Sequence, residues 1–257
     1  MTLTGDISLP GHALALIGGL MAGTIDAIAG GGGLITVPAL LAIGLPPHLA
    51  LGTNKVQSTV GVATAMLRYR QGRLVRIRDW KRAIAFTALG AAAGTALIQR
   101  MSPGLLTWLI PALLIAILAW TLLSPDLGSE PRPERVKPSV LQPAAGAIIG
   151  FHDGFFGPGT GTFWAMTLVG LGGLDLRKAT AATKVMNVTS NLVAAALFLA
   201  AGQIVVTVAL AMAAGQVIGS LIGSHLVLRR PPRFIRWVLI ASVTATATRL
   251  IWRQLAG

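Results

Sequence analysis

The sequence predicts an all-α polytopic membrane protein of two inverted-topology repeats, each with a glycine-broken helix pair and three crossing helices. Three observations predict this fold class. Of the 257 residues, 54% are hydrophobic and only 11% are charged, less than half the roughly 25% of a typical soluble domain. Motifs recur at a constant offset, and basic residues cluster in a few loops. This composition, which includes no cysteine, excludes a soluble globular enzyme, a disulfide scaffold and a disordered basic protein.

Apolar runs of suitable length predict the crossing helices. A bilayer core of roughly 30 Å needs about 20 apolar helical residues per crossing. Two shorter pieces, 34–44 and 162–172, would each cover only about 16 Å as helix and cannot easily cross alone. No Lys or Arg precedes Lys55, so we expect the first run to remain as a span rather than to be a cleaved signal peptide. The longer runs occupy 11–29, 48–67, 83–100, 104–123, 141–156, 178–200, 204–228 and 234–252.

A polar, proline-containing segment of mixed charge predicts a linker between two halves. We divide the chain into membrane repeat 1 at 1–123, a cytoplasmic linker at 124–139 and membrane repeat 2 at 140–257. A shift of 129 residues aligns the halves, and the matches extend beyond the abundant glycines. It pairs Lys55-Val56 with Lys184-Val185, Arg100 with Arg229, Pro103 with Pro232 and Trp108 with Trp237.

The basic residues predict that equivalent loops lie on opposite sides of the membrane. The loop 68–82 holds seven Lys or Arg residues against one Asp, whereas its counterpart at about 197–211 has no charge. At the next turn the asymmetry reverses, because Arg100 stands alone while 229–236 holds four arginines. Short cytoplasmic loops carry the Lys/Arg excess, so we expect both basic loops and the linker in the cytoplasm and both termini outside. The net charge of +13 is then an orientation signal, not the sign of a nucleic-acid partner.

A glycine-rich break precedes each short apolar piece. Residues 30–33 read GGGG and residues 157–161 read GPGTG, which cannot continue as stable helix. Unpaired backbone at membrane depth survives only where protein or a water-filled cavity covers it, and each short helix would point its N-terminus at the break. The alternative is that these glycines only let helices approach closely. The breaks therefore supply the first candidates for substrate binding: Gly30, Gly31, Gly32, Gly33, Gly157, Gly159 and Gly161.

Ionisable residues near the breaks are the other candidates, because such residues are costly inside a span. Lys55 and Lys184 lie on the spans that follow the breaks, each within a polar stripe of one helix face. Snorkelling of these lysines to the membrane interface is the alternative. The stripes add Asn54, Ser58, Asn187 and Asn191 to the candidate substrate-binding residues. Three further residues, which could instead cap helices or pack in the core, are candidate proton or charge partners: Asp26, His152 and Asp153.

We expect no metal, no cofactor and no enzymatic activity. The sequence has four scattered histidines and no carboxylate cluster or catalytic constellation. The expected partners are a small anionic substrate, drawn by the lysines and the helix N-termini, and the lipid bilayer. The aromatic residues around the second break could wall the site or serve only as packing.

The chain resembles the TauE/SafE sulfite exporter family, most closely its YfcA-like branch, in three segments. They read GTIDAIAGGGGLITVPALLAIGLPPHLALGTNKVQS, GFHDGFFGPGTGTFWA and KATAATKVMNVTSN. The resemblance implies a multi-pass permease of the bacterial inner membrane that exports small anions such as sulfite or an organosulfonate. We expect alternating access around a midplane site between the breaks. The alternative is a membrane-embedded channel or assembly factor without active transport.

Overall fold

The computed structural model describes residues 8–123, 133–230 and 234, and these residues form helices and connecting turns without a strand. The predicted last span at 234–252, both termini and most of the linker lie outside the described residues. The all-α prediction is confirmed for the described part. Its helices are α1 (Leu9–Ala29), α2 (Gly33–Ala42), α3 (Pro47–Gln71), α4 (Lys81–Gln99), α5 (Pro103–Leu123), α6 (Pro138–Phe155), α7 (Thr160–Gly170), α8 (Leu176–Ala200) and α9 (Val206–Arg229), with a 3₁₀ turn, η1, at Ile77–Trp80.

Within the described residues, four stretches of helix are long and apolar enough to cross a membrane, namely α1, η1 with α4, α8 and α9. Large apolar side chains on their outer surface support this. Leu14, Ile17 and Met21 of α1 and Leu210 of α9 are each more than half exposed. A soluble monomer rarely leaves such an apolar surface in water, whereas a lipid bilayer covers it.

Two helices begin or end beyond the predicted limits for identifiable local reasons. The helix α3 continues to Gln71, into the predicted basic loop, with Arg68 and Arg70 in its last turn. Cations are favoured there by the negative end of the helix dipole. The helix α8 begins at Leu176 because the carboxylate of Asp175 accepts a hydrogen bond from the backbone N–H of Lys178 and caps the N-terminus.

The predicted breaks are present, and each is followed by a short helix. The helix α1 ends at Ala29 and is followed by Gly30 with φ 81°, and Gly159 precedes α7 with φ 84°. Residues other than glycine rarely adopt this left-handed backbone conformation. The helices α2 and α7 have 10 and 11 residues, or about 15–17 Å at 1.5 Å per residue, too little to cross a bilayer. Each packs against the helix before it, α2 against α1 and α7 against α6.

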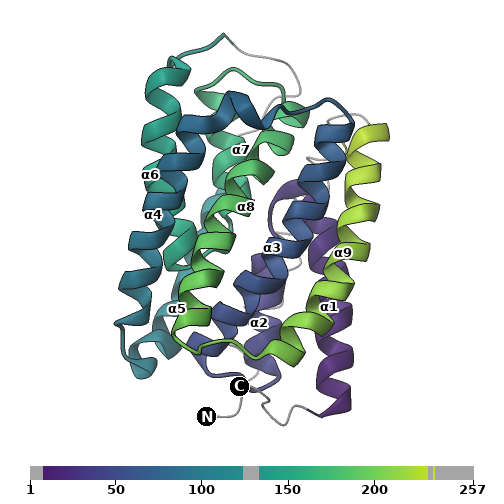
Figure 1. The fold of residues 1–257 in the computed structure, drawn as a ribbon, viewed down its shortest axis with the longest axis vertical. Coiled ribbons are helices and arrows are strands. Elements are labelled where there is room, and N and C mark those ends of the chain that lie inside the picture. Colours follow the sequence, from purple (N-terminus) through teal and green to yellow (C-terminus); the bar gives the residue numbers. More distant parts are fainter. Residues whose placement is uncertain (1–7, 124–132, 231–233, 235–257) are drawn as a thin grey trace.

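The helix boundaries recur at the offset found in the sequence. Adding 129 to the limits of α3, Pro47 and Gln71, gives the limits of α8, Leu176 and Ala200. In Figure 1, α3 runs from the bottom of the view to the top, whereas α8 beside it runs from the top to the bottom. The most extensive packing joins α1 to α9 and α4 to α6, so each half of the chain packs mainly against the other half.

Glycines on α4 and α9 make this packing possible. A Cβ atom added at Gly94 would lie 2.1 Å from the carbonyl oxygen of Phe151 in α6, and one at Gly219 would lie 2.1 Å from that of Leu20 in α1. Helix backbones approach this closely only where the side chain is absent. Close approach of helices, the alternative role considered for the glycines of the breaks, is therefore the role of Gly94 and Gly219.

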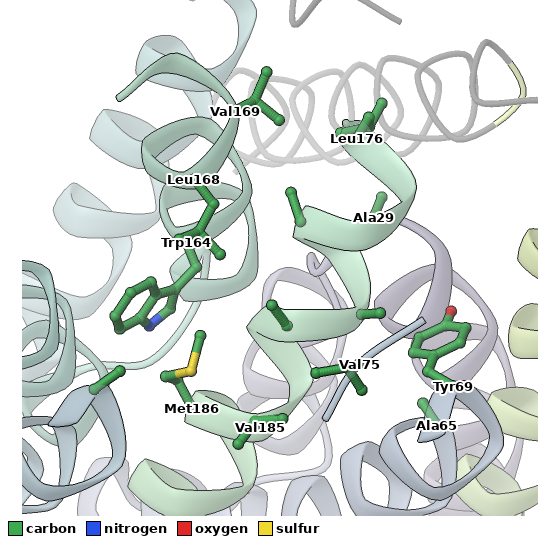
Figure 2. Close-up of a cluster of buried hydrophobic side chains, with 14 of the residues drawn as sticks. Ala29, Ala65, Tyr69, Val75, Trp164, Leu168, Val169, Leu176, Val185 and Met186 are labelled. Carbon is green, nitrogen blue, oxygen red and sulfur yellow. The ribbon is translucent and has the colours of Figure 1, made fainter. Parts of the chain in front are cut away.

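The largest core cluster surrounds the start of α8 and fixes the first break (Figure 2). Its bulkiest members, Tyr69 of α3 and Trp164 of α7, have no exposed surface. The hydroxyl of Tyr69 donates a 2.6 Å hydrogen bond to the carbonyl oxygen of Ala27, in the last turn of α1. The apolar cluster thus anchors the chain immediately before the glycines of the break.

Figure 1 shows that α4 begins and α9 ends at the same end of the bundle. Basic residues from distant parts of the chain, Lys81 and Arg82 of α4 and Arg229 of α9, are therefore brought to this end. A surface cavity of about 280 Å³ is lined by Arg73, Arg76 and Lys178. The guanidinium of Arg177 donates to the carbonyl oxygen of Arg230. Arg100 lies at the opposite end, where α4 finishes.

We predict that Gly94→Val strongly destabilises the protein, because the new side chain forces α4 and α6 apart. Overpacking of this kind costs about 1–3 kcal/mol or more of unfolding free energy. Gly104→Val in α5 is the matched control, because no atom lies within 4 Å of an added Cβ there. Thermal unfolding in detergent measures both. Equal melting temperatures for the two variants would contradict the packing assignment.

Candidate functional site

The two glycine breaks, which are far apart in the sequence, meet backbone to backbone. A Cβ atom added at Gly30 would lie 2.6 Å from the Cα of Gly161, and one added at Gly161 would lie 2.4 Å from the Cα of Gly30. Gly33 is similarly close to Pro158, with 3.0 Å between its added Cβ and the Pro158 Cα. Neither break could hold this contact with a larger residue at Gly30 or Gly161.

A small polar cavity of about 20 Å³ lies at this junction. It has room for about one water molecule. Four helices and both breaks contribute to its walls, and most of the predicted site residues are among them. The lining residues are Asp26, Gly30, Gly33, Asn54, Lys55, Ser58, Val62, Asp153, Gly157, Thr160, Gly161, Asn187 and Asn191.

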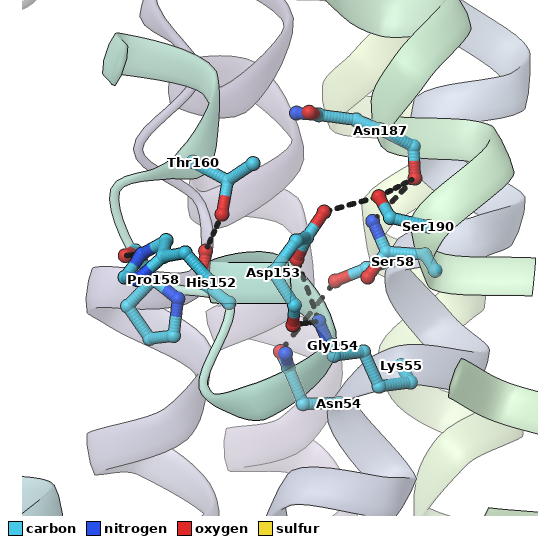
Figure 3. A network of polar contacts seen from close by, with 12 residues as sticks. Asn54, Lys55, Ser58, His152, Asp153, Gly154, Pro158, Thr160, Asn187 and Ser190 are labelled. Carbon is cyan, nitrogen blue, oxygen red and sulfur yellow. Dashed lines mark hydrogen bonds and ion pairs between the residues drawn. The ribbon is translucent and has the colours of Figure 1, made fainter. Parts of the chain in front are cut away.

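Lys55 of α3 pairs with a carboxylate of the other half of the chain (Figure 3). Its Nζ atom lies 2.6 Å from Oδ1 of Asp153, in the last turn of α6, and also donates to the backbone carbonyl of Asp153. The second carboxylate oxygen, Oδ2, accepts a hydrogen bond from the hydroxyl of Ser190 in α8. The side chains of Lys55 and Asp153 are only 1% and 3% exposed.

Lys184 of α8 makes the reciprocal pair with the first half. Its Nζ atom lies 3.3 Å from Oδ2 of Asp26, in the last turn of α1, and donates to the backbone carbonyl of Asp26. Oδ1 of Asp26 accepts a 3.3 Å hydrogen bond from the N–H of Gly32, next to the start of α2. The Asp26 side chain is 9% exposed, and that of Lys184 is fully buried beneath it.

These contacts explain how four charges are accommodated inside the protein. A buried ion is tolerated only when opposite charge and hydrogen bonds replace its hydration. Each ammonium has a carboxylate and the carbonyl of a helix's last turn, where the helix dipole presents negative charge. Because each lysine uses the other half of the chain, the pairs also join the two halves at the cavity.

The carboxamide of Asn54 is oriented toward the cavity by its neighbours. Its Oδ1 accepts hydrogen bonds from Thr36 at 2.5 Å and from Gln57 at 2.8 Å, with Ser58 at 3.5 Å. Since the oxygen is fully engaged, the amide NH₂ group is the free end of the side chain, and Asn54 lines the cavity. Hydrogen-bond donors of this kind suit an anionic ligand.

Asn187 and Asn191 of α8 form the opposite wall. The amide of Asn191 donates a 2.7 Å hydrogen bond to the backbone carbonyl of Asn187. The Oδ1 atom of Asn187 is buried and has no partner within the described residues. A buried polar atom without a partner is costly, so this carboxamide is available to a ligand in the cavity.

Five predicted residues do not line the cavity. Three of them, Gly31, Gly32 and Gly159, belong to the breaks but are not part of the cavity wall. Lys184 pairs with Asp26 on the side of Asp26 away from the cavity. The Nε2 atom of His152 lies 3.1 Å from the Pro158 carbonyl oxygen (Figure 3). The His152 ring packs edge-on to Phe163.

The aromatic residues around the second break do not line the cavity. Phe156 and Trp164 are buried in two separate hydrophobic clusters. Phe151 and Phe155 stack on each other with ring centroids 6.1 Å apart.

The sequence analysis missed other residues at the site. Val62 and Thr160 line the cavity, and Thr36 and Ser190 hold its polar residues from behind. Ser190 could have been found, because it falls within the polar stripe of Asn187 and Asn191. Thr36 gave no signal within an apolar helix. Among the described residues, no three His, Cys, Asp or Glu side chains are grouped to hold a metal ion.

Comparison with known proteins gives consistent full-length matches. The family model for the sulfite exporter TauE/SafE matches residues 15–250. A probable membrane transporter protein of Haemophilus influenzae is 43% identical over 250 residues, covering 97% of this chain and 98% of that protein. The probable membrane transporter protein YfcA of Escherichia coli K12 is 39% identical over 233 residues, covering 91% of this chain and 87% of that protein. No solved structure matches.

We predict that Lys55→Met destabilises the protein by about 3–5 kcal/mol, because it leaves the carboxylate of Asp153 buried without a countercharge. The double variant Lys55→Met/Asp153→Leu should recover more than half of this loss. Lys178→Met, which breaks the exposed 3.3 Å pair with Asp175, is the control and should cost at most about 1 kcal/mol. Thermal unfolding in detergent measures all three. A double variant as unstable as Lys55→Met would contradict the pairing argument.

Proposed function

Because the chain belongs to the TauE/SafE sulfite exporter family, we propose that it moves a small oxyanion, such as sulfite or an organosulfonate, through the cavity where its two glycine breaks meet. The chain is a multi-pass membrane transporter of that family. The observation that carries the anion proposal is the placement of Lys55 and Lys184 beside this cavity. The family and the relatives are named as transporters, so a channel or assembly factor is not favoured.

The groups around the cavity support an anion rather than a cation or an apolar solute. The ammonium of Lys55 and the amide of Asn54 in the cavity wall carry hydrogen-bond donors, and the ammonium of Lys184 lies directly behind Asp26. The helices α2 and α7 begin at the breaks and direct their N-terminal N–H groups toward the same junction. A cavity of about 20 Å³ is too small for an oxyanion, so the described conformation is a closed one.

Alternating access around this closed site is the mechanism we propose. The matching limits of α3 and α8, together with their opposite directions, support two inverted-topology repeats. In transporters of that kind, one repeat rocks against the other around a fixed midplane site formed by discontinuous helices. Such a movement would separate Gly30 from Gly161 and break the lysine–aspartate pairs, so that the cavity opens to one side of the membrane at a time.

We propose that the basic end of the bundle faces the cytoplasm, with the protein in the bacterial inner membrane. Cytoplasmic loops carry the Lys/Arg excess, and the end formed by Arg73, Arg76 and Lys178 carries it here. The helix α1 runs parallel to α9, as the contacts of Leu20 with Gly219 and of Leu16 with Gly215 show. The start of α1 is therefore at the extracytoplasmic end, opposite Arg229.

We predict that Lys55→Gln and Lys184→Gln each lower sulfite flux into proteoliposomes by about 10- to 100-fold, as expected for the loss of a charge-assisted hydrogen bond. Lys178→Gln, an exposed position on the same helix as Lys184, should keep wild-type flux. Size-exclusion profiles establish that each variant is folded. If Lys184→Gln alone unfolds, the double variant Lys184→Gln/Asp26→Asn replaces it in the flux measurement, because it removes both charges of the pair. Normal flux in both single lysine variants would rule out the proposed site.

A further inference from the structure

The buried charges around the cavity cancel. In the part of the chain that the structure describes, the only buried charged side chains are Asp26, Lys55, Asp153 and Lys184. Two are cationic and two anionic, so the closed site is neutral. An anion that entered unaccompanied would leave a net negative charge in surroundings of low dielectric, which is strongly unfavourable. An anion that binds here therefore needs a cation with it.

The carboxylate of Asp26 makes contacts that an oxyanion could also make. One of its oxygens faces the N–H of Gly32, beside the start of α2, and the other faces the ammonium of Lys184. These are the contacts that a helix N-terminus and a lysine would offer to an oxyanion. For Lys184 to bind a substrate, Asp26 must give up its negative charge or move away.

Asp26 is held less firmly than Asp153. Its Oδ2 lies 3.3 Å from Lys184, whereas Oδ1 of Asp153 lies 2.6 Å from Lys55. The carboxylate of Asp153 accepts a hydrogen bond from the Ser190 hydroxyl, whereas that of Asp26 accepts a long one, 3.3 Å, from the N–H of Gly32. The Asp153 side chain is also 3% exposed compared with 9% for Asp26. Asp26 is thus the carboxylate that can be neutralised without breaking the tighter pair.

Few titratable groups surround Asp26 on the elements packed against α1. The helix α8 contributes Lys184, and α3 contributes Tyr69, whose hydroxyl is engaged by Ala27, and Lys55 across the cavity. The described parts of α2 and α7 present no ionisable side chain, and α9 faces α1 with glycines and Gln216 while its His225 is exposed. Lys184 is therefore the cation that pairs with Asp26.

We infer that the transported anion is accompanied by a proton and that Asp26 carries the proton, an inference that rests on the proposed function. A proton bonds to Oδ2 of Asp26, which becomes a neutral carboxylic acid. The ammonium of Lys184 is released and pairs with the incoming anion, so the net charge of the site stays at zero. When the anion leaves, Asp26 loses the proton and pairs with Lys184 again.

The test measures anion and proton movement together in proteoliposomes. The probes are sulfite, sulfate, taurine and methanesulfonate, the last with a charge that does not change near neutral pH. A trapped pH dye follows protons, and potassium with valinomycin sets the membrane potential. For methanesulfonate in wild-type protein we expect about one proton per anion, stimulation by a proton gradient, and no response to potential or sodium, because the site admits no net charge.

The variant Asp26→Asn assigns the proton to one residue. It should still move the anion but lose proton movement, and its flux should then respond to membrane potential. Asp79→Asn, an exposed carboxylate at the basic end, is the matched control and should behave as wild type. If Asp26→Asn does not fold, the potential dependence of wild-type methanesulfonate flux and the variant Asp26→Glu, which should keep proton movement, decide the question.

The outcomes separate this inference from the proposed function. Wild-type flux of a monovalent probe without protons, or flux driven by sodium, overturns proton coupling and leaves the anion transporter intact. Proton movement that persists in folded Asp26→Asn overturns the assignment to Asp26. Absence of wild-type flux for every probe overturns both the inference and the proposed anion transport.

Discussion

The pairing of each buried lysine with a carboxylate from the other half of the chain is the interaction on which the rest of the structure depends. Within the membrane an unpaired Lys55 or Lys184 would be costly, and neither has its partner within its own half. The halves must therefore interlock, as they do through α1 with α9 and α4 with α6. The same requirement places all four charges at one junction, where a substrate would meet them.

The glycines allow the polypeptide to satisfy this requirement. Backbone contact between Gly30 and Gly161 brings the ends of α1 and α6 close enough for their last-turn carbonyls to accept from lysines of the opposite half. Gly94 and Gly219 do the same for the long helices by removing the side chains between them.

Much of the fold and the site could be predicted because membrane proteins follow few rules. Length of apolar runs located the helices, and the cost of buried charge identified Lys55, Lys184, Asp26 and Asp153 as candidates. The partner of each lysine could not be predicted, because the position of Lys55 in the sequence does not show that it pairs with a carboxylate from the other half of the chain. Nor could the role of Thr36 be foreseen, since a threonine in an apolar helix has no distinguishing pattern. His152, a candidate proton or charge partner from the sequence, does not line the cavity and packs beside Phe163.

The packing of α1 against α9 has a consequence for biosynthesis. The helix α1 is the first described helix to leave the ribosome, and its main partner is the last. Until α8 and α9 have been inserted, Asp26 has no lysine and the glycine-lined face of α9 is missing from α1. The early helices must therefore wait in the membrane in a loosely associated state, and the final structure can form only when nearly the whole chain has been synthesised. The described helices are thus synthesised in one order and packed together in another.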